Sequence, residues 1–135
     1  MKQLATVLLV DDDETANFLN ARILTKMDVA DEVLVVRNGA EALAALARPG
    51  RPAPTLVLLD LNMPVMGGME FLEAYQGLPL AQQQSVRIVV LTTSMNSHEL
   101  GRVEELPIAG LVSKPLTTEK VNTLLQLHFP RPAVR

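Results

Sequence analysis

The stretch Leu4-Ala-Thr-Val-Leu-Leu-Val10, followed directly by Asp11-Asp12-Asp13-Glu14, decides the fold of this chain. The apolar run lacks polar alternation, which is typical of a strand buried on both faces of a parallel sheet. A second such run, Thr55-Leu-Val-Leu-Leu59, also ends in an acid, Asp60. Ligands of open parallel sheets bind in the crevice beyond the carboxyl ends of the strands, so we expect these acids to converge on one spot.

Five short runs rich in leucine or β-branched residues predict five strands, at residues 4–10, 32–36, 55–59, 86–91 and 108–112. Apolar residues spaced three and four positions apart predict helices between them, most clearly at Phe18, Leu19, Ile23 and Met27 and at Ala40, Leu43, Ala44 and Ala47. Further helices are expected at about 68–76, at about 97–105 and after Thr117. Strands that alternate with helices indicate an α/β fold, a doubly wound parallel sheet covered on both faces.

The length of 135 residues, with 48% apolar and 20% charged residues, is typical of one globular domain. We expect a single domain over residues 1–135, with its core at about 4–129 and a short tail at 130–135, and no effector domain. The net charge of −3 and the scattered basic residues argue against nucleic-acid binding. The first apolar run is too short for a signal peptide or a membrane span, so we expect a cytoplasmic protein.

The converging acids require a positive partner. Two carboxylates held about 4 Å apart repel by roughly 4 kcal/mol at an effective dielectric constant near 20. A hard cation bound by oxygen relieves this repulsion, and Mg²⁺ is suited to a few carboxylates, a backbone carbonyl and retained waters. The chain contains no cysteine, which excludes thiol nucleophiles and Cys-ligated metals.

Four motifs, each at a predicted strand end, resemble those of the receiver domain of two-component response regulators. They are Val10-Asp11-Asp12, Asp60-Leu-Asn-Met-Pro-Val-Met-Gly-Gly68, Thr92 and Ser113-Lys114-Pro115. The resemblance covers essentially the whole chain and is greatest to the stand-alone type similar to the chemotaxis response regulator. It implies a flavodoxin-like fold with a five-stranded parallel sheet in the order 2-1-3-4-5, flanked by five helices.

The resemblance also implies a role for each matched residue. It makes Asp60 the phosphoacceptor, Asp12 a direct Mg²⁺ ligand, Asp11 a ligand mainly through water and Asn62 a ligand through its backbone carbonyl. Thr92 and Lys114 are expected to contact the phosphoryl group. The peptide bond between Lys114 and Pro115 is cis in the family. These roles suit phosphoryl transfer, in which positioning and charge neutralisation supply most of the catalysis.

The partners implied by the resemblance are a sensor histidine kinase or a histidine phosphotransfer protein as donor, and an unknown downstream protein. The output face is expected to comprise the helix at 97–105, the strand at 108–112 and the last helix, or the phosphoryl group passes on in a relay. The protein would catalyse only its own phosphorylation and slow dephosphorylation, as a monomer or weak dimer. At the position where many receivers carry a switching aromatic, this chain has Leu111, which lacks a polar tip.

Several alternatives remain open. An acidic run after a strand often serves as a helix N-cap and first turn, and we assign this role to Asp13 and Glu14. Thr93 competes with Thr92 for contact with the phosphoryl group, whereas His98 and His128 are expected to be ordinary surface or boundary residues. A phosphohydrolase of the haloacid dehalogenase type would also use Asp and Mg²⁺ but needs Asp-x-Asp, where this chain has Asp60-Leu-Asn62. A scaffold receiver that is never phosphorylated is the third possibility.

Overall fold

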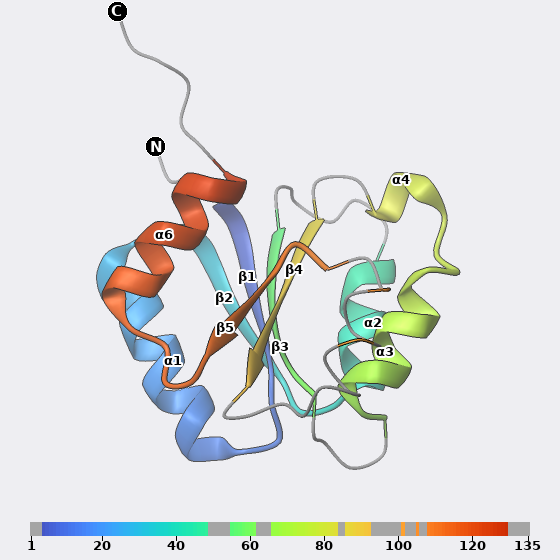
Figure 1. Cartoon of the computed structure of the whole chain (residues 1–135), viewed down its shortest axis with the longest axis horizontal. Helices are drawn as coiled ribbons and strands as arrows, with labels where there is room; N and C mark the ends of the chain where they lie inside the picture. The colour runs from blue at the N-terminus through green and yellow to red at the C-terminus, as the bar shows by residue number, and fades with distance from the viewer. Residues whose placement is uncertain are drawn as a thin grey trace, which may run out of the picture.

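A computed structural model describes residues 4–48, 55–61, 66–83, 86–92, 101, 105 and 108–129. The chain forms one sheet with helices on both faces (Figure 1). In chain order the elements are β1 (Leu4–Val10), α1 (Glu14–Met27), β2 (Ala30–Val36), α2 (Gly39–Ala47), β3 (Thr55–Asp60), α3 (Gly68–Tyr75), α4 (Leu80–Gln83), β4 (Val86–Thr92), β5 (Gly110–Ser113) and α6 (Thr118–His128).

The sheet confirms the predicted architecture. Its five strands lie in the order β2-β1-β3-β4-β5, and every neighbouring pair is parallel. β1 and β3 are adjacent, with Val10 opposite Leu59, so Asp11 and Asp60 follow two neighbouring positions at the same end of the sheet. The central position of these two strands explains why their sequences carry the longest apolar runs: both faces of each strand are covered.

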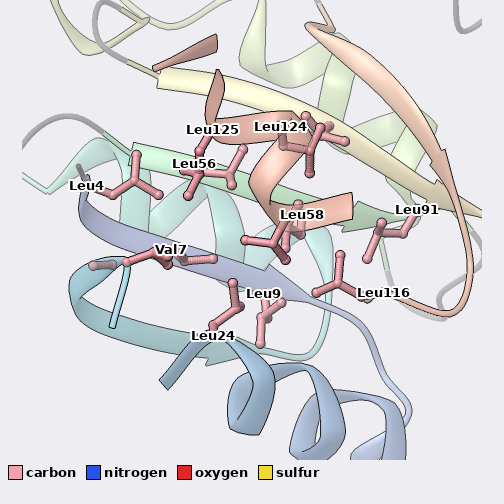
Figure 2. Packing of buried hydrophobic residues seen from close by; sticks show 14 residues of the cluster. Leu4, Val7, Leu9, Leu24, Leu56, Leu58, Leu91, Leu116, Leu124 and Leu125 are labelled. Atoms are coloured by element: carbon pink, nitrogen blue, oxygen red, sulfur yellow. The ribbon is translucent and has the colours of Figure 1, made fainter. Parts of the chain in front are cut away.

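Two apolar clusters, one on each face of the sheet, make up the core. The first joins α1 and α6 to one face. Figure 2 shows Leu24 of α1 beside Leu9, and Leu124 and Leu125 of α6 near Leu58 and Leu56. The second cluster joins α2 and α3 to the opposite face, through residues that alternate with the first set along each strand: Leu8, Val10, Val57, Leu59, Ile88 and Val90. The core therefore fixes the strand ends from both sides.

The positions of the described helices were predicted better than the burial of their side chains. α1 and α2 are confirmed, yet Phe18 and Leu19 are 65% and 50% exposed, and the deepest side chain of α1 in the first cluster belongs to Leu24. The short helix α4 was not predicted, because its run of glutamines carries no apolar spacing. The helix predicted at 97–105 lies almost entirely outside the described residues. No helix in the described part of the chain is long and apolar enough to span a membrane.

The last helix follows its sequence signals closely. Thr117 is the N-cap of α6, and its hydroxyl accepts a hydrogen bond from the backbone N–H of Lys120 at 3.2 Å. This contact satisfies one of the N–H groups that a helix start leaves without a partner. Val121, Leu124 and Leu125 are buried, while Phe129 packs against the first cluster as a partly buried residue. α6 thereby anchors the end of β5 to the core.

Candidate functional site

The three predicted acids meet at the carboxyl end of the sheet. Carboxylate oxygens of Asp11, Asp12 and Asp60 all lie within 4.8 Å of one another. Asp11 and Asp60 are buried, with 5% and 9% of their surface exposed, and Asp12 is half-buried. The strand order explains this meeting, because β1 and β3 are neighbours although about fifty residues of chain separate them. Buried carboxylates at such spacing need compensation by positive charge.

The position of Asp11 is fixed from several sides. Its backbone N–H donates to the carbonyl of Val36 at 3.2 Å, which extends the β1–β2 pairing by one residue. Its backbone carbonyl accepts a hydrogen bond of 2.7 Å from the side-chain amide of Asn17 on α1. One of its carboxylate oxygens accepts from the backbone N–H of Asp13 at 3.0 Å. The first strand end is therefore held by strand, helix and turn together.

Asn17 was not singled out from the sequence. It is 6% exposed, and its Oδ1 has no hydrogen-bond partner among the described residues. A buried amide that satisfies only part of its hydrogen-bonding capacity costs stability. We therefore attribute the role of Asn17 to its hydrogen bond with the Asp11 carbonyl. A polar residue seven positions before the buried Leu24, on the same face of the helix, was the available signal.

Glycine is required where α3 begins, at Gly68. A Cβ atom at Gly68 would lie 2.7 Å from Leu61 Cα and 2.8 Å from the backbone oxygen of Asp60. The Gly68 N–H also donates to the carbonyl of Leu61 at 3.0 Å. α3 can therefore begin against the end of β3 only because this position lacks a side chain. The close approach of Leu61 and Asp60 is therefore the steric reason for glycine at this position.

Lys114 brings positive charge to the acids. Its Nζ lies 3.2 Å from Asp11 Oδ2 and 3.7 Å from Asp60 Oδ1, and 22% of its side chain is exposed. Its backbone N–H donates to the carbonyl of Thr92 at 2.8 Å, and the peptide bond to Pro115 is cis, as the resemblance implied. One ammonium facing three carboxylates leaves a net negative charge, so the arrangement still favours a cation.

Thr92 occupies the expected place at the end of β4. It is opposite Ser113 of β5 in the sheet register and one residue beyond Leu91, which is opposite Asp60. This register places Thr92 at the same end of the sheet as the acids and Lys114, where it is half-buried. The competing Thr93 and the carbonyl of Asn62 both fall outside the described residues.

The acidic run after β1 is divided in role, as predicted. Asp13 is the N-cap of α1, and its Oδ1 accepts from the backbone N–H groups of Thr15 and Ala16 at 2.9 and 3.1 Å. Glu14 begins the helix and forms an exposed ion pair of 3.4 Å with Arg37. These two acids serve the helix start, where negative charge is stabilised by the helix dipole. Two histidines were expected to be ordinary surface or boundary residues. His128 lies half-buried at the end of α6, and His98 falls outside the described residues.

The fold and the site agree with comparisons to known proteins. A family model of the response regulator receiver domain matches residues 7–126. The response regulator Rcp1 of Synechocystis sp. is 30% identical over 124 residues, which cover 89% of this chain and 83% of that protein. A probable chemotaxis protein CheY of Rhizobium etli is 26% identical over 123 residues, with 91% of each chain covered.

Solved structures give the same result. The crystal structure of a response regulator receiver protein from Dyadobacter fermentans matches with a TM-score of 0.83 at 28% identity, covering 94% of this chain and 99% of that chain. A chemotaxis response regulator of Vibrio cholerae matches with a TM-score of 0.75 at 30% identity, covering 91% and 97%. Sequence, strand order and the acidic pocket lead to one conclusion: this chain belongs to the family of response regulator receiver domains.

Proposed function

We propose that this receiver accepts a phosphoryl group on Asp60 from a phosphohistidine donor, with Mg²⁺ bound beside it. The observation that carries the proposal is the position of Lys114, whose ammonium reaches both Asp11 and Asp60 from another strand. A lysine that only stabilised the fold would have no need to approach the acid that ends β3. Here one cation stands beside both a metal-binding acid and the proposed nucleophile.

The donor set suits Mg²⁺. Carboxylate oxygens are hard ligands, and three of them lie within 4.8 Å of one another. Direct octahedral ligands of Mg²⁺ lie at about 2.0–2.1 Å from the ion, so a set this wide leaves room for a contact through water. We therefore propose Asp12 and Asp60 as direct ligands and Asp11 as a ligand mainly through water, with the Asn62 carbonyl completing the protein's share. When bound, the ion neutralises charge on the phosphoryl oxygens.

The proposed step is an in-line displacement. A carboxylate oxygen of Asp60 attacks the phosphorus, the bond from phosphorus to the donor's imidazole nitrogen breaks, and the nitrogen keeps the electron pair. The product is an aspartyl phosphate. The Lys114 ammonium balances the charge on this phosphate, and the Thr92 hydroxyl donates a hydrogen bond to it. Such groups act by being in place before the reaction, which is how most catalysis of phosphoryl transfer is achieved.

The donor has an open approach beside this site. A hollow of about 760 Å³ lies between α1 and the connection from β5 to α6, and its lining includes Leu19, Pro115 and Lys114. Leu19, which lines this hollow, and its neighbour in the sequence, Phe18, are the exposed large apolar side chains of α1. Exposed apolar surface that is continuous with a reactive site is typical of a docking surface. We propose that a cytoplasmic histidine kinase or histidine phosphotransfer protein binds there.

Output is proposed to use another face. Between β5 and α6 lies a hollow of about 350 Å³, bordered by Leu111, Thr123, Leu127 and His128. Leu127 is 68% exposed and Leu111 is 37% exposed. A phosphoryl group adds about −1.5 to −2 charge, and its pull on Thr92 and Lys114 acts on the strands that border this face. A change of surface at β5 and α6 would then alter the binding of a downstream protein.

Incubation with acetyl phosphate and Mg²⁺, followed by intact mass measurement, tests the proposal. We expect the wild-type chain to gain one phosphoryl group. Asp60→Asn should abolish the gain, whereas the matched control Asp31→Asn, which alters an exposed acid on β2, should leave it unchanged. Equal labelling of wild type and Asp60→Asn would refute the assignment of the nucleophile.

The mass measurement, together with an assay for inorganic phosphate released from unrelated phosphate esters, separates the two alternatives. A phosphohydrolase of the haloacid dehalogenase type would release many equivalents of inorganic phosphate per chain from unrelated phosphate esters. A scaffold receiver would neither gain mass nor release phosphate. A single stoichiometric gain that depends on Asp60 is the result that supports a receiver acting through phosphorylation.

A further inference from the structure

Lys120, on the first turn of α6, is directed at the segment that carries Lys114. Its Nζ donates to the carbonyl of Ser113 at 2.7 Å, to the hydroxyl of Ser113 at 3.3 Å and to the carbonyl of Pro115 at 2.9 Å. A lysine ammonium has three N–H donors, and here each has an acceptor. Two of these acceptors are the backbone carbonyls of the residues on either side of Lys114.

This contact compensates for a weakness of the sheet at this point. β5 is an edge strand of four residues that pairs with β4, and its side chains alternate between half-buried and exposed. The backbone N–H of Lys114 bonds to Thr92, whereas the neighbouring carbonyls of Ser113 and Pro115 point to Lys120. The peptide groups around Lys114 are therefore held from β4 on one side and from α6 on the other.

Lys120 is itself well fixed. It follows the N-cap of α6 by three residues, and its backbone N–H is the group bonded by Thr117. The next residue, Val121, is fully buried in the cluster beneath the sheet. The contact to the segment around Lys114 thus starts from a rigid helix that the core holds in place.

We propose that Lys120 is a positioning residue for phosphorylation, which fixes the backbone around Lys114 so that the Lys114 ammonium stands beside Asp60. This inference rests on the proposed phosphorylation of Asp60. All three donors of Lys120 are engaged, so it acts on the phosphoryl group through Lys114 and makes no contact of its own. The sequence shows no sign of this role, because Lys120 lies outside every matched motif.

A double-mutant cycle in the full chain tests the proposal, with the initial rate of phosphorylation by acetyl phosphate and Mg²⁺ as readout. We expect Lys120→Met to slow phosphorylation about tenfold, which is less than the roughly 10²-fold that a 1 Å misplacement can cause. In a Lys114→Met background the same change should have no further effect. A tenfold loss in both backgrounds would overturn the proposal, because a merely structural or electrostatic role would not depend on Lys114.

The matched control is Arg87→Met. Arg87 is an exposed cation whose Nη1 donates to the Val86 carbonyl at 3.1 Å, at the opposite end of β4 from the acids. This variant removes one positive charge and a bond to a backbone carbonyl, and so shares with Lys120→Met the loss of charge, whereas Lys120→Met removes bonds to two carbonyls and a hydroxyl. We expect it to phosphorylate at the wild-type rate. If Lys120→Met matches Arg87→Met in rate, Lys120 is not a positioning residue.

A second readout separates this inference from the proposed function. Acylation of Lys114 by an amine-reactive reagent, followed by peptide mass measurement, reports how well its ammonium is held between Asp11 and Asp60. We expect Lys120→Met to raise the labelling of Lys114 several-fold over Arg87→Met. Unchanged labelling refutes the positioning of Lys114 by Lys120, whether or not the chain accepts a phosphoryl group. Raised labelling in a chain that is not phosphorylated refutes the proposed function and leaves the positioning of Lys114 in place.

Discussion

The two strand ends that face each other across the acidic pocket are held in different ways. β1 is central, its seven residues are nearly all buried, and Asp11 at its end bonds to Val36 and to the side chain of Asn17. β5 is a four-residue edge strand, and Lys114 at its end depends on a backbone bond to Thr92 and on exposed contacts of its neighbours. The acids are thus fixed by the core, and the cation opposite them by polar contacts at the surface.

This difference suits the proposed chemistry. A metal site needs ligands that stay in place while the ion binds, and buried backbone contacts provide that stability. The side that transmits phosphorylation to a partner must change its surroundings at low free energy. Parts of a protein that move are generally those with few buried apolar contacts and exposed hydrogen bonds. The unequal support of the two strand ends therefore separates the stable half of the site from the responsive half.

The largest effect that tests this comparison is the loss of apolar packing. Leu9 of β1 is 1% exposed and Leu111 of β5 is 37% exposed. We expect Leu9→Ala to lower the free energy of unfolding by about 2–5 kcal/mol, and Leu111→Ala by at most about 1 kcal/mol. Denaturant unfolding measures both values. Equal losses would mean that β5 is as firmly built into the core as β1.

Mg²⁺ should stabilise the chain through the β1 side. At a hundredfold excess over its dissociation constant, we expect the ion to raise the free energy of unfolding by about 2.7 kcal/mol. Asp12→Asn should lose most of this gain, whereas Lys114→Met should keep it or increase it, because the ammonium that pairs with Asp11 competes with the ion. Thermal unfolding with and without Mg²⁺ measures these gains in stability. A wild-type chain whose stability does not change with Mg²⁺ would contradict Mg²⁺ binding at the acids.

The smallest of the three effects concerns Asn17. We expect Asn17→Ala to cost about 1–3 kcal/mol of stability, because it leaves the buried Asp11 carbonyl without its donor. The affinity for Mg²⁺, measured by calorimetric titration, should fall as the backbone before Asp12 loosens. Asn122→Ala, an exposed change on α6, is the matched control. A variant at Asn17 that equals this control in stability and affinity would show that the helix contributes nothing to the first strand end.

Strand positions and the acid site could be predicted because each depends on a local pattern. The run ending at Val10 was placed with its observed bounds, and the parallel order then required Asp11 and Asp60 to meet. Edge strands were predicted less well: β2 starts at Ala30, two residues earlier than expected, and β5 covers Gly110–Ser113 instead of 108–112. Their sequences are partly exposed and so carry a weaker apolar signal.

What the sequence did not predict depends on contacts between side chains and backbone carbonyls a few residues away. Asn17 and Lys120 each donate a hydrogen bond to a backbone carbonyl, and the spacing of residues in a sequence does not predict where a carbonyl will lie. The exposure of Phe18 was not predicted, because helical spacing predicts a helix but does not decide which of its apolar residues meet the sheet. Propensity and spacing therefore predicted the strands, most of the helices and the helix cap at Asp13, but they did not predict the side chains that donate to backbone carbonyls.

The strand order has one more consequence for this pocket. The helix after β1 packs on one face of the sheet with α6, and the helix after β3 packs on the other face with α2 (Figure 1). Since α1 and α3 cover opposite faces, the connections after β1 and β3 lead to opposite sides of the sheet, which is the arrangement that leaves a crevice in open parallel sheets. A crevice of this kind follows from the path of the chain and does not depend on which side chains fill the core. A redesigned sequence with a wholly different core but the same connectivity would keep a crevice beyond the ends of β1 and β3, where other polar groups could be placed.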